Sequence, residues 1–209
     1  MCFHSKQTKD AQTLENRFKA KFKDKNVTLA KEYNGFQYPQ TPVITNTSPE
    51  LIQMYSWGLI PHWAKDENIR ANTLNAKMET ISEKPSFRDV IHNRCLILAD
   101  GFYEWQWLDS KGKNKQKYEI SLPEHQAFAF AGLWSQWTNP TTKELHFSYS
   151  ILTTEANELM STIHNSKKRM PLIVAREEEQ NWLQGETLHT QNNLLTATPI
   201  LKDNQLMLF

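Results

Sequence analysis

The sequence predicts an α+β fold: a single domain built on a curved, mixed or antiparallel β-sheet of barrel-like form, with a few inserted helices. Short apolar or alternating runs typical of strands dominate the chain, and only a few segments have helical periodicity. Strands and helices also do not alternate in the strict order of a parallel α/β fold. With 209 residues, 39% of them hydrophobic, we expect one core and one domain over residues 1–209.

The amino-terminal half is expected to begin with a helix and to continue in strands. Leu14, Phe18 and Phe22 recur at i, i+4 and i+8. This spacing predicts a helix over residues 10 to about 23, with Asp10 as its N-cap. Short apolar runs then predict strands at residues 42–45, 51–57 and 95–99.

The second half is expected to contain more strands and two short helices. Neighbouring antiparallel strands are predicted at 118–121, 127–134 and 147–151, with turns at the KGKNK run and at 137–143. Apolar spacing predicts a helix that begins after Thr154, its expected N-cap, and ends near His164. A strand at 171–174 and a helix at 176–184, with Gly185 in the C′ position, are predicted to follow.

Composition and charge exclude several classes of protein. The longest strongly apolar stretch, residues 127–134, is far shorter than the roughly 18 to 20 residues that cross a bilayer, so no membrane span is expected. The first residues lack the apolar run of a secretory signal, and the two cysteines do not form a disulfide pattern, so we expect a cytoplasmic protein. Because CxxC, HExxH and glycine-rich phosphate motifs are absent from the sequence, we predict no metal and no cofactor.

Nucleic-acid contacts, if the protein makes them, are expected at local basic patches. Lys and Arg total 24 against 23 Asp and Glu, a formal net charge of +1, which does not favour a broad basic surface. Three basic runs stand out, at 17–31, at 111–117 (KGKNKQK) and at 167–169. A solvated surface is the simpler interpretation of the first two.

Cys2 has distinctive chemistry if Met1 is removed, because its α-amine and thiol would then be neighbours. Ordinary pKa values of about 7.7 to 8.0 for the amine and about 8.5 for the thiol leave both partly deprotonated near neutral pH. Such an aminothiol condenses with an aldehyde to an imine, which the sulfur closes to a thiazolidine ring. Position alone favours a terminal cysteine without a role, and inert burial is expected for Cys95.

Three other segments contain candidate polar groups. Asn75, Lys77 and Glu79 alternate, so an extended backbone would put them on one side to hold a phosphate and a sugar hydroxyl; a surface loop is an equal interpretation. Glu104, within GFYEW, is expected at or just past a strand end among aromatic residues, either as a general acid or base or as a salt-bridged structural residue. His164 at a helix end is either catalytic or a favourable contact with the helix dipole.

Tryptophans could also provide stacking faces for nucleobases. The candidates are Trp57, Trp63, Trp105 and Trp107, of which we expect one or two to be functional and the rest to be core.

Taken together, these motifs resemble the SRAP family, the SOS-response-associated peptidase-like proteins that crosslink to abasic sites in single-stranded DNA. The similarity extends in order over nearly the whole chain, and its combination of motifs is specific. The matching residues are Met1-Cys2, Pro39, WGLIPHWA (57–64), NAKMET (75–80), GFYEW (101–105), AGLW (131–134), ILTTEA (151–156), and Ile163-His164 followed by RMP (169–171).

The resemblance implies a catalytic role for four residues. Cys2, once Met1 is removed, would form the thiazolidine with the ring-opened deoxyribose. Asn75 would orient the Cys2 terminus and the sugar, Glu104 would move protons during imine formation and reversal, and His164 would assist sugar ring opening. DNA contacts are expected from Pro39, Trp63, Lys77, Thr153, Lys167, Lys168 and Arg169.

The sequence departs from the family pattern at three places. Phe3 and His4 stand where the family commonly has Gly and Arg, so a guanidinium contact is missing there. Lys77 replaces a usual Arg and loses its bidentate fork. The link between His164 and Arg169 is longer and more basic than the shortest family version, and we predict that it contacts phosphates.

Three functions are carried forward. The leading hypothesis is a DNA-repair enzyme that shields abasic sites by crosslinking to them, with a possible associated lyase activity through the imine. A cysteine-type peptidase or autopeptidase using Cys2, and a non-catalytic single-stranded DNA-binding module, are the alternatives. The partner is expected to be single-stranded DNA with abasic sites, and the protein a monomer that associates with the bacterial nucleoid when bound to DNA.

Overall fold

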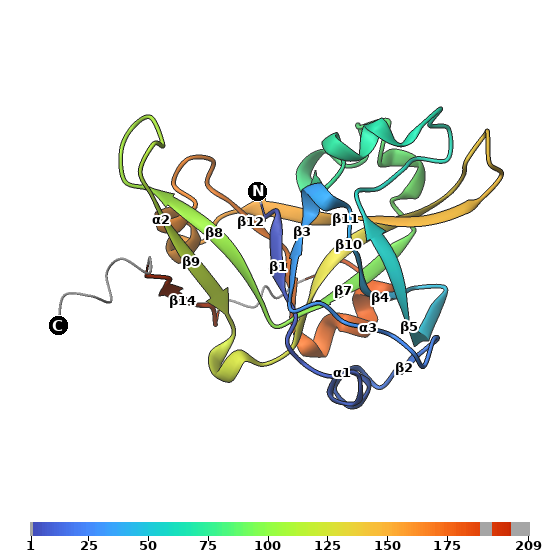
Figure 1. Cartoon of the computed structure of the whole chain (residues 1–209), viewed down its shortest axis with the longest axis horizontal. Coiled ribbons are helices and arrows are strands. Elements are labelled where there is room, and N and C mark those ends of the chain that lie inside the picture. Colours follow the sequence, from blue (N-terminus) through green and yellow to red (C-terminus); the bar gives the residue numbers. More distant parts are fainter. Residues whose placement is uncertain (1, 189–193, 202–209) are drawn as a thin grey trace.

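The computed structural model describes residues 2–188 and 194–201, and its strands form two sheets (Figure 1). The larger sheet has nine strands, in the order β12-β11-β10-β7-β4-β5-β2, with β13 paired to β10 and β6 paired to β11. Their bounds are β2 (Lys21–Phe22), β4 (Gln40–Thr45), β5 (Ser48–Trp57), β6 (Asn75–Lys77), β7 (Arg94–Ala99), β10 (Phe128–Thr138), β11 (Leu145–Glu155), β12 (Arg169–Pro171) and β13 (Ile173–Val174).

Five strands of the larger sheet form a closed barrel. Antiparallel pairing runs from β11 through β10, β7 and β4 to β5, and β5 then pairs in parallel with β11 at Ser56 and Trp57. The α+β, barrel-like class predicted from the sequence is therefore confirmed.

The smaller sheet has five strands, in the order β14-β9-β8-β1-β3. Its members are β1 (His4–Lys6), β3 (Glu32–Asn34), β8 (Gly101–Trp107), β9 (Lys115–Ser121) and β14 (Thr196–Pro199). β8 follows β7 after a single residue, Asp100, so the chain passes directly from the barrel into this second sheet. The pairing of β9 with β8 and β14 corrects the expectation that residues 118–121 lie beside the 127–134 strand.

The helices are short and lie around the sheets. They are α1 (Ala11–Phe18), α2 (Glu158–Ile163) and α3 (Glu179–Leu183), with 3₁₀ turns η1 (Gly35–Gln37), η2 (Glu67–Asn72), η3 (Met78–Thr80), η4 (Arg88–Val90), η5 (Pro123–His125) and η6 (Arg176–Glu178). In Figure 1, α2 lies beside β8, and α1 crosses below the barrel.

Local signals explain where the helices begin and end. The Asp10 side chain caps α1 by accepting from the Thr13 amide, as predicted, but Lys19 adopts a left-handed conformation with φ 55°, so the helix ends at Phe18. Phe22 therefore lies in β2 instead of a helix. α2 is capped by Asn157, not by Thr154, because β11 continues through Thr154 to Glu155. Gly185, with φ 96°, follows α3 as expected for a C′ glycine.

The core consists of two large clusters, one on each face of the barrel wall. Cys95, Ile97 and Ala99 of β7 belong to one cluster, while Leu96 and Leu98 belong to the other. Because β7 is buried on both faces, its sequence is a continuous apolar run without alternation. The expected burial of Cys95 is confirmed by its 0% exposure.

Candidate functional site

Cys2 lies just before β1, an inner strand of the smaller sheet. β1 pairs with β3 on one side, through Ser5 and Tyr33, and with β8 on the other, through Ser5 and Phe102. Cys2 is 0% exposed, and its Sγ donates to the His4 carbonyl at 3.6 Å. Met1, whose removal we predict, lies outside the described residues.

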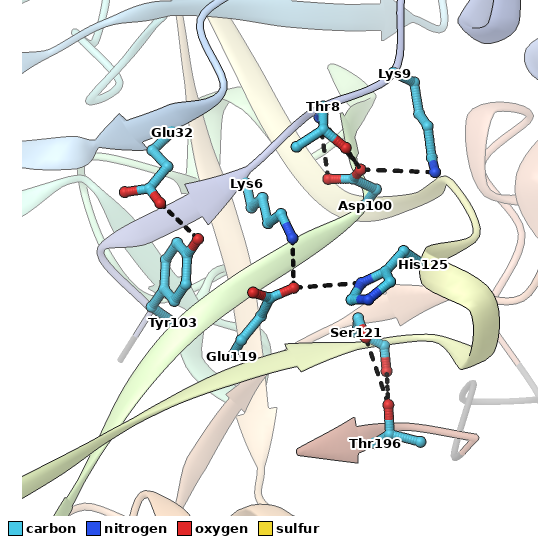
Figure 2. A network of polar contacts seen from close by, with 10 residues as sticks. All are labelled: Lys6, Thr8, Lys9, Glu32, Asp100, Tyr103, Glu119, Ser121, His125 and Thr196. Carbon is cyan, nitrogen blue, oxygen red and sulfur yellow. Dashed lines mark hydrogen bonds and ion pairs between the residues drawn. The ribbon is translucent and has the colours of Figure 1, made fainter. Parts of the chain in front are cut away.

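A polar network fixes β1 and its flanks in place (Figure 2). The Lys6 ammonium donates to Glu119 at 2.5 Å, and Glu119 also lies 3.3 Å from the His125 ring. The Thr8 hydroxyl and amide donate to the buried Asp100, which follows β7. These contacts join β1 to β9 and to the end of β7, so the position of Cys2 is defined by the whole sheet.

Asn75 lies against Cys2 from the other sheet. β6 places it beside Ile151 of β11, and its Nδ2 donates to the Cys2 carbonyl at 2.9 Å. Its Oδ1 is buried and has no hydrogen-bond partner among the described residues. A buried amide oxygen without a partner is costly, so this atom is a ready acceptor for a donor on an incoming group.

Glu104 lies in the middle of β8, opposite Tyr118 of β9, and not at a strand end as the sequence analysis predicted. It is 4% exposed, and burial raises the pKa of its carboxyl to about 7. Burial also raises the pKa of the Cys2 thiol, and the negative charge of Glu104 adds to that rise. A carboxyl with this pKa can both donate and accept a proton near neutral pH.

His164 caps the C-terminal end of α2, and its ring faces Glu104. The His164 Nε2 lies 4.0 Å from the Glu104 Oε2, and both side chains are buried. The His164 Nδ1 lies 2.7 Å from the Arg169 carbonyl and 3.2 Å from the Arg169 amide. A ring nitrogen cannot donate and accept at once, so we assign the proton to Nδ1 from the shorter contact, which leaves Nε2 as an acceptor toward Glu104. Burial lowers the pKa of this imidazole to about 4.

A cavity of about 440 Å³ opens onto these groups from the surface. Glu104 and His164 line its inner part, while cationic and aromatic side chains line the rest. The lining residues are Phe3, Lys77, Glu104, Trp105, Trp107, His164, Ser166, Lys167 and Arg169. We call it the Glu104 cavity.

The residues predicted to contact DNA are only partly brought together. Lys77, Lys167 and Arg169 line the Glu104 cavity, whereas Pro39 and Trp63 are not among its lining residues. Trp63 is 47% exposed in the segment after β5.

Arg169 and Thr153 make contacts within the protein. Both terminal nitrogens of the Arg169 guanidinium donate to the Glu79 carboxylate at 2.8 Å. The same guanidinium donates to the Thr153 carbonyl at 2.7 Å, and Thr153 is 0% exposed. Lys168, which precedes Arg169, has a left-handed backbone conformation with φ 50°.

The structural roles of two residues were not predicted from the sequence. Glu79 was expected beside Asn75 and Lys77 on an extended strand, but β6 ends at Lys77, and Glu79 lies in η3, where it pairs with Arg169. Asn165 was counted only as part of the link after His164, yet its side chain bonds both backbone groups of Trp107. The pairing partners lie far away in the sequence, so local patterns do not indicate them.

Among the described residues, no cluster of three or more His, Cys, Asp or Glu side chains could hold a metal ion. In the same part of the chain, no helix is long and apolar enough to cross a bilayer.

A sequence model of the SOS response associated peptidase (SRAP) family matches residues 1–207. The chain belongs to the SRAP family. The fold brings together the four residues for which the resemblance implies a catalytic role. Asn75 bonds to the Cys2 carbonyl, and His164 faces Glu104.

Named SRAP relatives come from bacteria and vertebrates. The abasic site processing protein YoqW of Bacillus subtilis is 46% identical over 142 residues, which are 68% of this chain and 61% of YoqW. The abasic site processing protein HMCES of Xenopus tropicalis is 30% identical over 200 residues, covering 80% of this chain and 58% of HMCES. The matches thus span about three fifths of these relatives.

Solved structures share the SRAP architecture. A protein from Bacteroides thetaiotaomicron superposes with a TM-score of 0.86 at 33% identity, over 97% of this chain and 93% of that one. A protein from Bordetella bronchiseptica has the same fold, with a TM-score of 0.80 at 23% identity, over 96% of this chain and 100% of that one.

Proposed function

We propose that this protein processes abasic sites in single-stranded DNA by forming a covalent thiazolidine crosslink through Cys2, after removal of Met1, and so shields the lesion. The names of the SRAP relatives, abasic site processing proteins, support the substrate class. The observation that carries the proposal is the 2.9 Å bond from Asn75 to the Cys2 carbonyl, because it anchors the chain terminus beside a buried acid and imidazole.

The chemistry needs an amine, a thiol and proton transfer. In its open form the abasic sugar has an aldehyde at C1′, which the Cys2 amine attacks; loss of water then gives an imine. The Cys2 sulfur adds to the imine carbon, and its proton ends on the nitrogen, which closes the five-membered ring. The sum is aldehyde plus aminothiol giving thiazolidine plus water, with no oxidant or reductant.

Glu104 and His164 are suited to the proton transfers. Loss of water requires an acid at the carbinolamine oxygen, and a carboxyl with a pKa of about 7 is still largely protonated at slightly acidic pH. A neutral His164, with Nε2 as an acceptor, can take the hydroxyl proton of the closed sugar and release the aldehyde. The Asn75 Oδ1, which is buried and has no hydrogen-bond partner among the described residues, would accept from the Cys2 amine.

The same imine supports strand incision. An imine at C1′ acidifies the protons on C2′, and a base that removes one of them expels the 3′ phosphate by β-elimination. Ring closure by the Cys2 sulfur removes the imine and therefore competes with incision. A crosslinking enzyme with weak lyase activity is the expected result.

The test uses untagged protein and a single-stranded oligonucleotide with one abasic site, followed by denaturing gels and intact mass. We expect a heat-stable adduct from protein that lacks Met1. Cys2→Ala keeps the amine but lacks the sulfur, so it should give an adduct only after borohydride reduction of the imine. If Met1-free wild-type protein forms no adduct, or Cys2→Ala forms the same heat-stable one, the proposal is wrong.

A peptidase is the second candidate, favoured by the family's description and by the pair of His164 and Glu104, whose charge acts on the Cys2 thiol. A cysteine peptidase needs a thiolate with a lowered pKa, whereas burial and Glu104 raise the pKa of the Cys2 thiol. The raised pKa of the thiol favours a reaction that begins with attack by the Cys2 amine over one that begins with attack by a thiolate. Cleavage of a peptide panel without adduct formation would reverse the choice.

A further inference from the structure

Two basic segments that are about fifty residues apart in the sequence lie side by side in the fold. One is the hairpin between β8 and β9, which contains the KGKNKQK run, and the other is the loop at 164–168 after α2 (Figure 1). Asn165 joins them: its Nδ2 donates to the Trp107 carbonyl at 2.9 Å, and its Oδ1 accepts from the Trp107 amide at 3.0 Å. The hairpin that contains the KGKNKQK run is therefore bonded, through Trp107, to the loop that follows His164.

The hairpin holds the indole of Trp107 in place. The Asp109 side chain accepts from the amides of Lys111 at 2.8 Å and Asn114 at 2.6 Å, which folds the tip tightly. Gly112, with φ 63°, then packs on the ring so closely that a Cβ there would lie 2.6 Å from the indole carbons. Only glycine fits this contact, so the hairpin supports Trp107 as a preorganised surface.

Trp107 and Ser166 both border two cavities. One is the Glu104 cavity, and the other, of about 480 Å³, lies between the two loops. Its lining residues are Trp107, Leu108, Asp109, Ser110, Asn165 and Ser166. Cationic side chains lie beside both cavities. The Lys115 ammonium lies 5.5 Å from the Trp107 ring centroid, and Lys167 lines the Glu104 cavity.

We propose that Trp107 and these two loops form a nucleotide subsite, in which the base next to the abasic sugar stacks on the Trp107 indole. The phosphates of that nucleotide contact Lys115 and Lys167. The subsite rests on the proposed function, since the Glu104 cavity must hold the sugar. An abasic sugar has no base of its own to stack, so a neighbouring base is the nearest aromatic group that can anchor the strand.

The recognition expected here is tolerant of sequence. Every nucleobase has a face that can stack on an indole. Asp109 and Asn165, which line the second cavity, already use their side chains on backbone groups of the two loops. Loss of one stacked base typically weakens single-strand binding about 5- to 150-fold.

The experiment measures affinity without crosslinking. Oligonucleotides contain one tetrahydrofuran abasic analogue, which has no aldehyde, and 2-aminopurine on its 5′ or its 3′ side. With the full chain we expect quenching of 2-aminopurine on one side. Trp107→Ala should remove this quenching and weaken binding about 5- to 150-fold, and Trp107→Phe should recover most of the affinity. Leu145→Ala, which changes an exposed apolar side chain that lines neither cavity, is the control.

A second arm changes the DNA instead of the protein, so it does not depend on how the variants fold. Replacing the neighbouring base by a second tetrahydrofuran should cost wild-type protein the same factor as Trp107→Ala, and the two changes together should cost little more. Equal affinity with and without the neighbouring bases on both sides would overturn the subsite. Adduct formation with a true abasic site is scored separately, so failure of the crosslinking proposal is recognised by its own assay.

Discussion

Burial acts on two neighbouring side chains in opposite directions. It raises the pKa of Glu104 to about 7 and lowers the pKa of His164 to about 4. Between these two values both groups are uncharged, with a proton on the carboxyl and a lone pair on the imidazole Nε2. The resting pair therefore holds both a proton to donate and a lone pair that can accept one, without a buried charge, whose desolvation is costly.

The free energy of unfolding should record the raised pKa of Glu104. A raised carboxyl pKa stabilises the folded protein below the unfolded value, near 4.5, and this stability is lost as the pH rises through about 7. The lowered pKa of His164 has the opposite effect, because it makes the free energy of unfolding rise with pH between about 4 and 6.5. His164 is present in both wild type and Glu104→Gln, the two proteins compared. Between pH 5 and 8, wild type should lose about 2 to 3 kcal/mol relative to Glu104→Gln in urea unfolding. Parallel stability curves for the two proteins would contradict this expectation.

Asn75→Ala should slow crosslinking while leaving DNA affinity nearly unchanged. The variant removes the donor to the Cys2 carbonyl, so the terminus is no longer held where the amine can attack. Loss of such positioning typically costs about 10- to 100-fold in rate. Single-turnover adduct formation gives the rate, and binding to the tetrahydrofuran oligonucleotide is the control. A wild-type rate would show that Asn75 does not position Cys2.

At the scale of strands and helices, local sequence patterns predicted the features that depend only on neighbouring residues, such as a buried strand or a helix cap. The run 95–99 predicted a buried strand because β7 faces a core cluster on each side, and Asp10 predicted the start of α1. The parallel pairings of β11 with β5 and β6 join segments about 75 to 90 residues apart and leave no local signal. β8 was not predicted as a strand of its own, because Glu104 was expected at or just past the end of the preceding strand, whereas only Asp100 separates β7 from β8.

The pairing of η3 with the start of β12 is an element contact that local sequence did not indicate. Glu79 holds Arg169 through two bonds, and the Arg169 backbone in turn holds the His164 ring. Glu79 is thus a positioning residue. Glu79→Gln should slow crosslinking roughly tenfold and move the pKa of His164 up from about 4 toward its ordinary value, because a loosened ring admits water.

NMR titration of the His164 ring in Glu79→Gln gives this pKa directly, and single-turnover assays give the rate. Glu177→Gln, which changes an exposed glutamate of η6, is the matched control. A slowed Glu79→Gln with an unchanged His164 pKa would mean that the ion pair serves only the fold.

For the whole molecule, the site lies where the two sheets meet. Cys2 precedes β1, and Glu104 lies in β8 of the smaller sheet. Asn75 lies in β6 of the larger sheet, and His164 ends α2, which connects β11 to β12 of that sheet. A formal net charge of +1 leaves DNA attraction to local cations beside this junction.

Lys167→Ala with Lys168→Ala should therefore weaken single-strand binding and flatten its salt dependence. Each phosphate contact on a single strand contributes about 0.7 to the slope of log affinity against log salt, so two lysines should lower it by about 1.4. Lys23→Ala with Lys25→Ala, in the amino-terminal basic run, is the control. Equal slopes for the two double variants would place the phosphate contacts elsewhere.

The position of β1 also determines the order of events during synthesis. β1 cannot be enclosed until β8 exists, because its neighbours are residues 32–34 and 101–107. At about 5 to 20 residues per second, the ribosome needs roughly 5 to 20 s to deliver them. The nascent start of the chain is exposed to methionine-trimming enzymes throughout this interval, whereas the finished fold buries Cys2 completely. Maturation of the nucleophile is therefore expected to occur on the ribosome, before the protein has folded.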